Sequence, residues 1–206
     1  MEEKEIQNEL ASIRNLMERS SKFISLSGLS GILAGVYALI GAALAYNIVY
    51  RGSSRIYTSL NVHEYPQSLY NLIIIAMAVL LLSLTSGVIL TRNKAKRKGQ
   101  PIWGKISQQL LFHMAIPLIT GGILILMLIY RGYYGVVAST SLIFYGLSLV
   151  SASNFTFTMV KYLGLSEIIL GLIAACLPGY GLLFWAVGFG VLHIIYGSLM
   201  YLKYDK

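Results

Sequence analysis

Six long apolar stretches constrain the fold of this chain more than any other feature of its sequence. They cover residues 24–50, 69–90, 106–130, 134–153, 158–177 and 181–202. Each approaches the roughly 20 residues that an α-helix needs to cross a hydrocarbon core about 30 Å thick. The chain is 56% hydrophobic and only 12% charged, which is unusual for a soluble domain. We therefore predict an all-α integral membrane protein with a six-helix transmembrane domain over residues 23–206.

The basic residues predict the orientation of these helices. Most lysines and arginines fall on one side of a six-span zigzag, and only Arg51, Arg55 and Arg131 fall on the other. By the positive-inside rule, both termini are cytoplasmic in a multi-pass protein of the cytoplasmic (inner) membrane. The net charge of +8 is then explained by topology, and no nucleic-acid partner is expected. Residues 92–98 are interpreted as a stop-transfer anchor on lipid headgroups, or alternatively as a docking loop for a partner.

The connections between the stretches predict three antiparallel hairpins. Residues 131–133 and 178–180 leave room only for tight turns, and the second of these turns contains a Pro-Gly pair. Residues 51–67 form the longest polar segment between two stretches, which is too short for a binding domain.

A different helix is predicted before the first span. Ile6, Leu10, Ile13 and Met17 recur at helical spacing and form one apolar stripe. Residues 1–22 are therefore predicted as a cytoplasmic amphipathic helix. Its other face mixes acids and bases and lacks the basic character of a helix that lies on anionic lipid. Three occupants remain open for the stripe of residues 2–19: the chain's own loops, a second copy, or a cytoplasmic protein partner.

Small residues in the first span predict close helix packing. Gly31 and Gly35 form a GxxxG pair, which suits packing within the chain or a homodimer. The segment GLSGILAG at residues 28–35 also resembles GLSEIILG at residues 164–171, which suggests a weak internal repeat. If the repeat is real, Glu167 stands where the first copy has Gly31.

Glu167 is the only carboxylate inside the six apolar stretches. A charge in the middle of a bilayer is costly, so such an acid normally faces a protein interior or a watery cavity. His113 and His193 lie inside the third and sixth stretches. Counted from the nearest lysine on the cytoplasmic side, all three residues lie within about 9 to 15 Å of the inner boundary, at nearly one depth. We therefore predict that they can meet.

Hydroxyl groups occur at the same level in the other stretches, including Ser30, Ser86 and Ser151. Buried polar groups need partners, and a shared layer supplies them. Pro117 leaves the carbonyl of His113 without its helical hydrogen bond, which predicts a kink in the third span.

This polar cluster has four interpretations: a structural polar belt, a transport or proton-relay site, a zinc site formed by two histidines and one carboxylate, or a switch that alters helix packing. Cys176 is the only cysteine, and no nucleophile, dinucleotide or phosphate-loop motif is present. We therefore expect no enzyme activity and no cofactor.

Two functions follow from these features. The first is a non-enzymatic sensory, regulatory or scaffolding protein that acts through protein partners. The alternative is a transporter of small solutes or ions, proton-coupled through the Glu/His cluster. The transporter predicts a water-accessible path to Glu167, and a dry, sealed acid counts against it.

Overall fold

The computed structural model describes residues 27–51, 66–97, 99, 103–177 and 179–205. In this part of the chain every regular element is a helix. Six helices are long and apolar enough to cross a membrane, as the sequence predicts: Gly28–Val49, Gln67–Arg97, Lys105–Tyr130, Tyr134–Phe155, Thr158–Cys176 and Gly181–Tyr204. The predicted amphipathic helix at residues 1–22 and the loop at residues 52–65 lie outside the described residues.

Three of the six helices are nearly regular. They are α3 (Pro66–Arg97), α4 (Lys105–Tyr130) and α6 (Thr158–Cys176). The first helix, α2 (Gly28–Tyr46), ends in a π-helical turn, η1 (Asn47–Arg51), and α5 (Val137–Ala152) lies between two 3₁₀ turns, η3 (Tyr134–Val136) and η4 (Ser153–Phe155). The last helix is composite: α7 (Gly181–Trp185), the π-helical segment η5 (Ala186–Leu192), α8 (His193–Met200) and a final π-helical turn, η6 (Tyr201–Asp205).

Helix α3 is longer than the second apolar stretch because it continues through the basic segment to Arg97. Lysine and arginine are good helix formers, and cations near a helix C-terminus interact favourably with the helix dipole. Lys94, Lys96 and Arg97 occupy the last turn. The basic segment is therefore largely helical.

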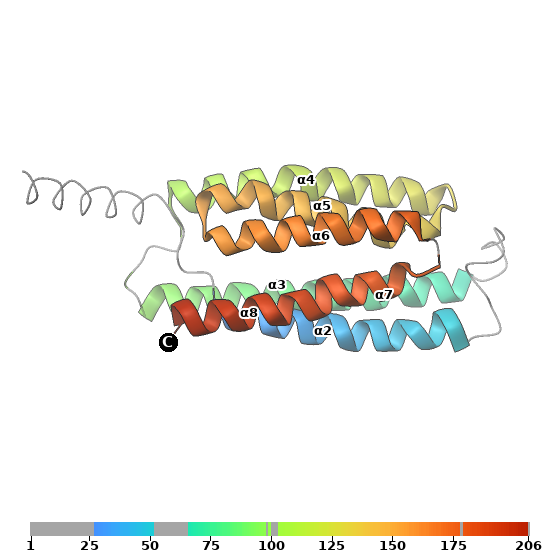
Figure 1. Ribbon diagram of the computed structural model, residues 1–206, viewed down its shortest axis with the longest axis horizontal. Coiled ribbons are helices and arrows are strands. Elements are labelled where there is room, and N and C mark those ends of the chain that lie inside the picture. Colours follow the sequence, from blue (N-terminus) through green and yellow to red (C-terminus); the bar gives the residue numbers. More distant parts are fainter. Residues whose placement is uncertain (1–26, 52–65, 98, 100–102, 178, 206) are drawn as a thin grey trace, which may run out of the picture.

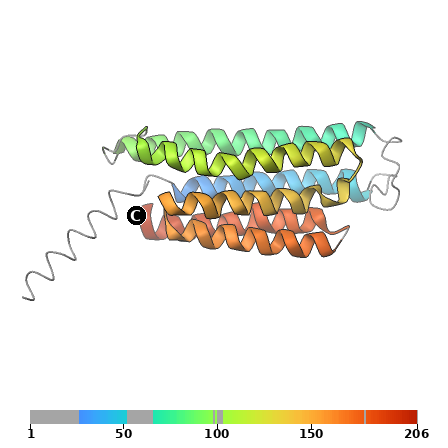
Figure 2. The ribbon, with the colours of Figure 1, turned by 90° about the horizontal axis from the view of Figure 1, so that it is seen from above.

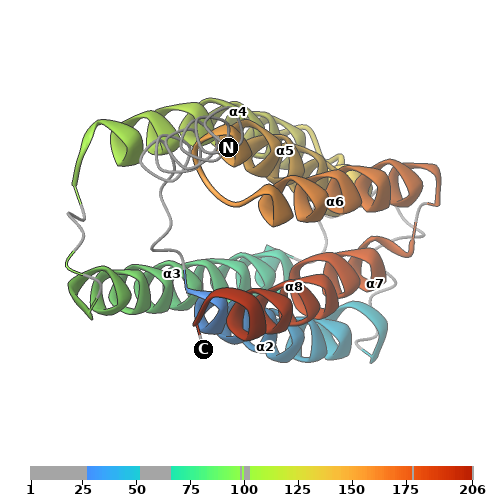
Figure 3. The same ribbon diagram turned by 60° about the vertical axis from the view of Figure 1, so that its left-hand side comes forward.

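The helices form two groups (Figure 1). In one group α5 packs between α4 and α6, and in the other α2 packs between α3 and the last helix, α7–η5–α8. Figure 2 shows that the helices run side by side along the long axis, and Figure 3 shows the two groups facing each other. The groups meet where α7, η5 and α8 pack on α5 and α6.

Glycines bring helix backbones together within each group. A Cβ added at Gly35 of α2 would lie 2.6 Å from the carbonyl oxygen of Gly190, and one at Gly197 would lie 2.5 Å from the amide nitrogen of Ile32. In the other group, a Cβ at Gly146 of α5 would lie 2.5 Å from the carbonyl oxygen of Gly164. Only glycine, which has no Cβ, lets two helix backbones approach this closely.

An apolar core joins the two groups near the C-terminal end of the chain. It contains Leu149, Phe157, Val160, Leu163 and Met200, with Tyr145, Met159, Leu192, Tyr196 and Tyr204 packed against it. The ring centroids of Phe157 and Tyr204 are 4.3 Å apart, and Lys94 Nζ of α3 lies 5.9 Å from the Phe157 ring centroid. The contact between the groups is thus closed at this end by apolar and aromatic side chains.

Candidate functional site

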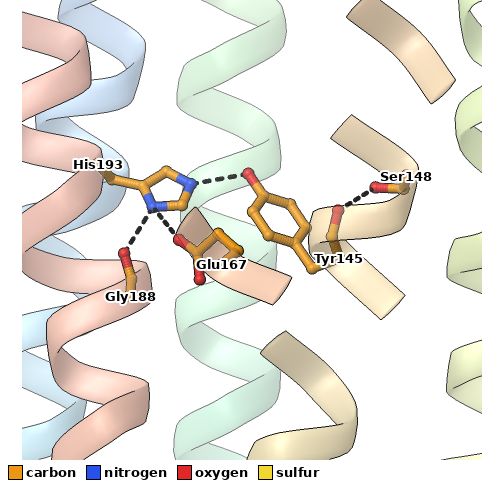
Figure 4. A network of polar contacts seen from close by, with 5 residues as sticks. All are labelled: Tyr145, Ser148, Glu167, Gly188 and His193. Atoms are coloured by element: carbon orange, nitrogen blue, oxygen red, sulfur yellow. Dashed lines mark hydrogen bonds and ion pairs between the residues drawn. The ribbon is translucent and has the colours of Figure 1, made fainter. Parts of the chain in front are cut away.

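The candidate site lies where the two groups of helices meet, and we call Tyr145, Glu167, Gly188 and His193 together the seam (Figure 4). Tyr145 comes from α5, Glu167 from α6, Gly188 from η5 and His193 from the start of α8. Glu167 is completely buried, with 0% of its surface exposed, and His193 is 6% exposed. The seam therefore places two ionisable side chains in an apolar interior.

The hydrogen bonds of His193 define the tautomer of its ring. Its Nδ1 lies 3.0 Å from the carbonyl oxygen of Gly188, and its Nε2 lies 2.7 Å from the hydroxyl oxygen of Tyr145. A carbonyl only accepts hydrogen bonds, so we assign the proton to Nδ1, which donates it to Gly188. In the neutral ring Nε2 then accepts the Tyr145 hydroxyl proton. Both nitrogens of the imidazole are thereby satisfied.

Glu167 is in the opposite situation, because neither of its carboxyl oxygens makes a hydrogen bond. Its Oε1 lies 3.4 Å from His193 Nδ1, which is within ion-pair range but longer than a usual N–H···O hydrogen bond. The Gly188 carbonyl is closer to the same nitrogen. A buried polar group without a hydrogen bond costs free energy, so this carboxyl is an expensive feature of the fold.

Gly188 makes room for the carboxyl. A Cβ added there would collide with Glu167 Oε2 and would lie 2.5 Å from Leu142 Cδ2. Gly188 also lies in the π-helical segment η5, which holds a second glycine, Gly190. π-Helical turns are rare and occur often at functional sites. Here the π turn and the missing side chain together place a backbone carbonyl beside the imidazole and an open face beside the acid.

Aromatic rings and a serine hold Tyr145 in place. Its ring centroid lies 4.9 Å from that of Phe189 and 5.4 Å from that of His193, and Trp185 packs against Phe189 at 5.1 Å. Ser148, fully buried one turn later, donates a hydrogen bond of 2.7 Å to the Tyr145 carbonyl. The Phe189 ring thus packs against the tyrosine ring whose hydroxyl contacts His193.

The structure brings together Glu167 and His193 but leaves His113 elsewhere. The His113 side chain is exposed on α4, stacks on Phe155 with 4.9 Å between ring centroids, and meets Phe112 edge-on at 5.8 Å. Pro117 lies inside α4, which runs without interruption from Lys105 to Tyr130. The acid thus has one imidazole beside it.

The predicted serines do not contribute hydroxyl groups to the seam. Ser30 donates to the Ser27 carbonyl at 2.6 Å, and Ser86 donates to the Ser83 carbonyl at 3.1 Å. The half-buried Ser151 accepts a hydrogen bond from the Asn154 side chain through its backbone carbonyl. Hydroxyls that bond the preceding turn of their own helix satisfy themselves locally.

Gly31 and Gly35 contact the last helix of the same chain. A Cβ added at Gly31 would lie 3.1 Å from Gly197 Cα, and one at Gly35 would lie 2.6 Å from the Gly190 carbonyl oxygen. The small-residue face of the first span is therefore used inside the bundle.

The seam offers proton exchange and hydrogen-bond rearrangement as its chemistry. Within the described residues no three histidine, cysteine or acidic side chains are grouped so that they could hold a metal ion. What the seam does contain is one carboxyl, one imidazole and one phenol in contact across the two helix groups.

Tyr145 and Gly188 are the two seam residues that sequence reasoning missed. Most tyrosines of this chain cluster near the ends of the apolar stretches, where an amphipathic ring suits a headgroup region. Tyr145 lies in the middle of its stretch, and this position was the available indication that its hydroxyl needs a buried partner. Gly188 belongs to the run GFG, which has no feature that distinguishes it from other glycines in apolar helices.

Comparison of the chain with protein-family models, with curated proteins and with solved structures finds no match. The function must therefore be inferred from the seam and its setting.

Proposed function

We propose that the chain is a multi-pass protein of the cytoplasmic membrane with both termini in the cytoplasm and its spans arranged as three antiparallel hairpins. The six apolar helices support this, as does the packing of α2 with α3, α4 with α5 and α6 with α7. Large apolar side chains on α3 and α4, such as Leu82, Val88, Ile119 and Leu126, are more than half exposed, which suits a lipid environment.

The orientation is tested with a reporter that is active only outside the cytoplasm. Fusions in the turn at residues 131–133 are expected to be active, and fusions in the connection at residues 154–157 are expected to be inactive. The opposite pattern would contradict the proposed orientation.

Within that membrane, we propose a regulatory role in which the two helix groups act as a two-state device that works through protein partners and not through chemistry on a substrate. The observation that carries this proposal is the Glu167 carboxyl, completely buried between the groups with no hydrogen bond to either oxygen. A buried polar group without a hydrogen bond weakens the contact between the two helix groups. A change in the charge or hydrogen bonding of Glu167 is therefore expected to alter how the groups pack.

The experiment is affinity capture of the tagged protein from detergent-solubilised membranes, followed by identification of the proteins that come with it. The full chain is compared with a chain lacking residues 1–20, with Glu167→Gln, and with His113→Gln as the matched control outside the seam. We expect the truncation to lose the partners, Glu167→Gln to change the captured amount, and His113→Gln to behave as the full chain. An identical partner set with and without residues 1–20 would refute the regulatory role.

A proton-coupled transporter is the second candidate, and one observation favours it. The two carboxyl oxygens without hydrogen bonds lie at the junction of two helix groups, where a transported ion or proton would bind. The complete burial of Glu167 argues against an open water path in this conformation. Proton flux into reconstituted vesicles, driven by a potassium diffusion potential, separates the candidates. A proton flux that is abolished by Glu167→Gln supports transport. No proton flux through the unaltered protein supports regulation.

A further inference from the structure

We propose that the ligand of the seam is a proton: the sealed arrangement binds it on Glu167, and its release moves the His193 Nδ1–H hydrogen bond from the Gly188 carbonyl to the Glu167 carboxylate. This inference deepens the proposed function, on which it rests in taking the seam as the moving part.

The first support is that one N–H group faces two acceptors. His193 Nδ1 lies 3.0 Å from the Gly188 carbonyl oxygen and 3.4 Å from Glu167 Oε1. Figure 4 draws both contacts as dashed lines from this nitrogen. A single proton makes a good hydrogen bond to only one of them. Hydrogen bonds to a charged acceptor are roughly twice as strong as neutral ones. The Gly188 carbonyl therefore keeps the N–H while the carboxyl is neutral, and a carboxylate would compete for it.

The second support is that, in the part of the chain that the structure describes, no lysine or arginine forms an ion pair with Glu167. The titratable groups that contact Glu167 or its imidazole neighbour are His193 on α8 and Tyr145 on α5. The sequence has no lysine or arginine in residues 137–160 or 181–202, which include α5, η4, α7, η5 and α8, and Lys161 on α6 itself is exposed. A neutral His193 ring, which donates to Gly188 and accepts from Tyr145, fits these contacts and the burial of the side chain. The sealed seam therefore suits the uncharged carboxylic acid.

The third support is the lack of space for a larger cation. A single added Cβ at Gly188 would already collide with Glu167 Oε2. A metal ion would need several ligands about the carboxyl, and among the described residues no three histidine, cysteine or acidic side chains are grouped to hold one. A proton is the cation that the sealed carboxyl can take without moving a helix.

The consequence of proton release follows from the bonds that change. The Glu167 O–H gives its proton to water, His193 keeps the proton on Nδ1, and the chain loses one proton in total. The hydrogen bond from Nδ1 then runs to the carboxylate, and the Gly188 carbonyl in the π-helical segment loses its side-chain partner. Because η5 and α8, together with α7, are the elements that pack on the other helix group, we expect the contact to loosen.

The proton is detected directly by infrared difference spectroscopy in detergent. The carbonyl stretch of a protonated carboxyl is expected to disappear as the pH is raised, and this change is expected to be missing in Glu167→Gln, whose amide cannot titrate. His113→Gln is the control and keeps the change. A carboxyl band that persists unchanged in Glu167→Gln, or that does not respond to pH in the unaltered chain, overturns the proposal.

The movement is measured with a cysteine pair across the contact between the groups. A Cβ added at Gly181 of α7 would lie 3.1 Å from Ala138 Cβ of α5, so a small outward shift brings the pair to the roughly 3.5–4.5 Å of a disulfide. Ala138→Cys and Gly181→Cys are introduced together with Cys176→Ser, with Glu167 or with Glu167→Gln, and the rates of oxidation are compared at each pH. The ratio of the two oxidation rates, with Glu167 and with Glu167→Gln, cancels the pH dependence of the thiols.

We expect equal rates at acidic pH and about tenfold slower cross-linking of the Glu167 protein at alkaline pH, because the neutral amide mimics the protonated acid. A ratio that stays constant across pH overturns the inference. These two measurements and the partner capture experiment test different proposals. If the carboxyl does not titrate and the cross-linking ratio does not change, the proton site is refuted. If the captured partners are the same with and without residues 1–20, only the regulatory role is refuted.

Discussion

Replacing Glu167 by methionine is expected to stabilise the protein, which is the reverse of the usual result for a completely buried residue. Each of the two carboxyl oxygens lacks a hydrogen bond, and an unsatisfied buried group costs about 1–3 kcal/mol. Methionine has a similar length and carries no oxygen, and volume-conserving changes usually cost less than about 1.5 kcal/mol. The gain from removing two unsatisfied oxygens exceeds this repacking cost, so the expected net stabilisation is about 1–4 kcal/mol.

The assay is thermal unfolding in one detergent, where about 1 kcal/mol corresponds to roughly 2–4 °C in Tm for a chain of this size. Leu142→Met is the control, because Leu142 is also completely buried and lies beside Gly188. It changes shape at the same place without removing a polar group, so its Tm is expected to stay close to or below that of the unaltered protein. If Glu167→Met unfolds at a lower temperature than Leu142→Met, the carboxyl makes stabilising interactions and the reasoning is refuted.

The same variant separates stability from function. If the acid is retained for its effect on the helix contact, Glu167→Met should be more stable and yet fail to respond to pH in the cross-linking experiment. Such a trade-off is common where a functional group is held at a cost to the fold. A structural polar belt would show the opposite pattern, with lower stability and no effect on the response.

Three further substitutions probe the packing around the seam. Gly197→Ala is expected to destabilise the protein by about 3 kcal/mol or more, since the added methyl would meet the backbone of the first helix. Its control is Gly122→Ala, whose methyl would have no atom within 4 Å and which should be neutral or slightly stabilising in thermal unfolding. Tyr145→Phe is expected to cost about 1–3 kcal/mol by leaving a buried imidazole nitrogen without a donor. Tyr162 is 65% exposed, so Tyr162→Phe should cost much less. Equal Tm values for the two variants would contradict the assigned hydrogen bond. Gly188→Ala is expected to lower stability by about 1–3 kcal/mol, because its methyl would overlap the acid, and an unchanged Tm would show that the contact is loose.

Hydropathy predicts the six helices well because each of them is a long, continuous apolar stretch of the sequence. It predicts their ends less well, as α3 shows. Its last turns contain lysine and arginine, which the hydropathy of the sequence marks as the end of the span but which continue the helix without difficulty.

Depth can be counted along a sequence, but the direction in which a side chain faces cannot. His113, Glu167 and His193 were predicted at one depth, and only the latter two face the same contact. His113 is exposed on α4 and stacks on Phe155 of η4, away from the contact that holds the acid. Which helix faces are buried depends on neighbours far apart in the sequence. The partnership of Glu167 with Tyr145 and Gly188 depends on that arrangement in the same way.

The resemblance between residues 28–35 and 164–171 gains a physical meaning from the two helix pairs. In the first segment, Gly31 lets α2 approach the backbone of Gly197, where an added Cβ would lie 3.1 Å from the Cα. In the second segment, the position that corresponds to Gly31 carries Glu167. The residue without a side chain is here on the opposing helix, at Gly188 of η5. A carboxyl is tolerated there only because the chain gives up a side chain opposite it. The acid and the glycine, 21 residues apart in the sequence, therefore form one structural unit, since an added Cβ at Gly188 collides with the carboxyl of Glu167.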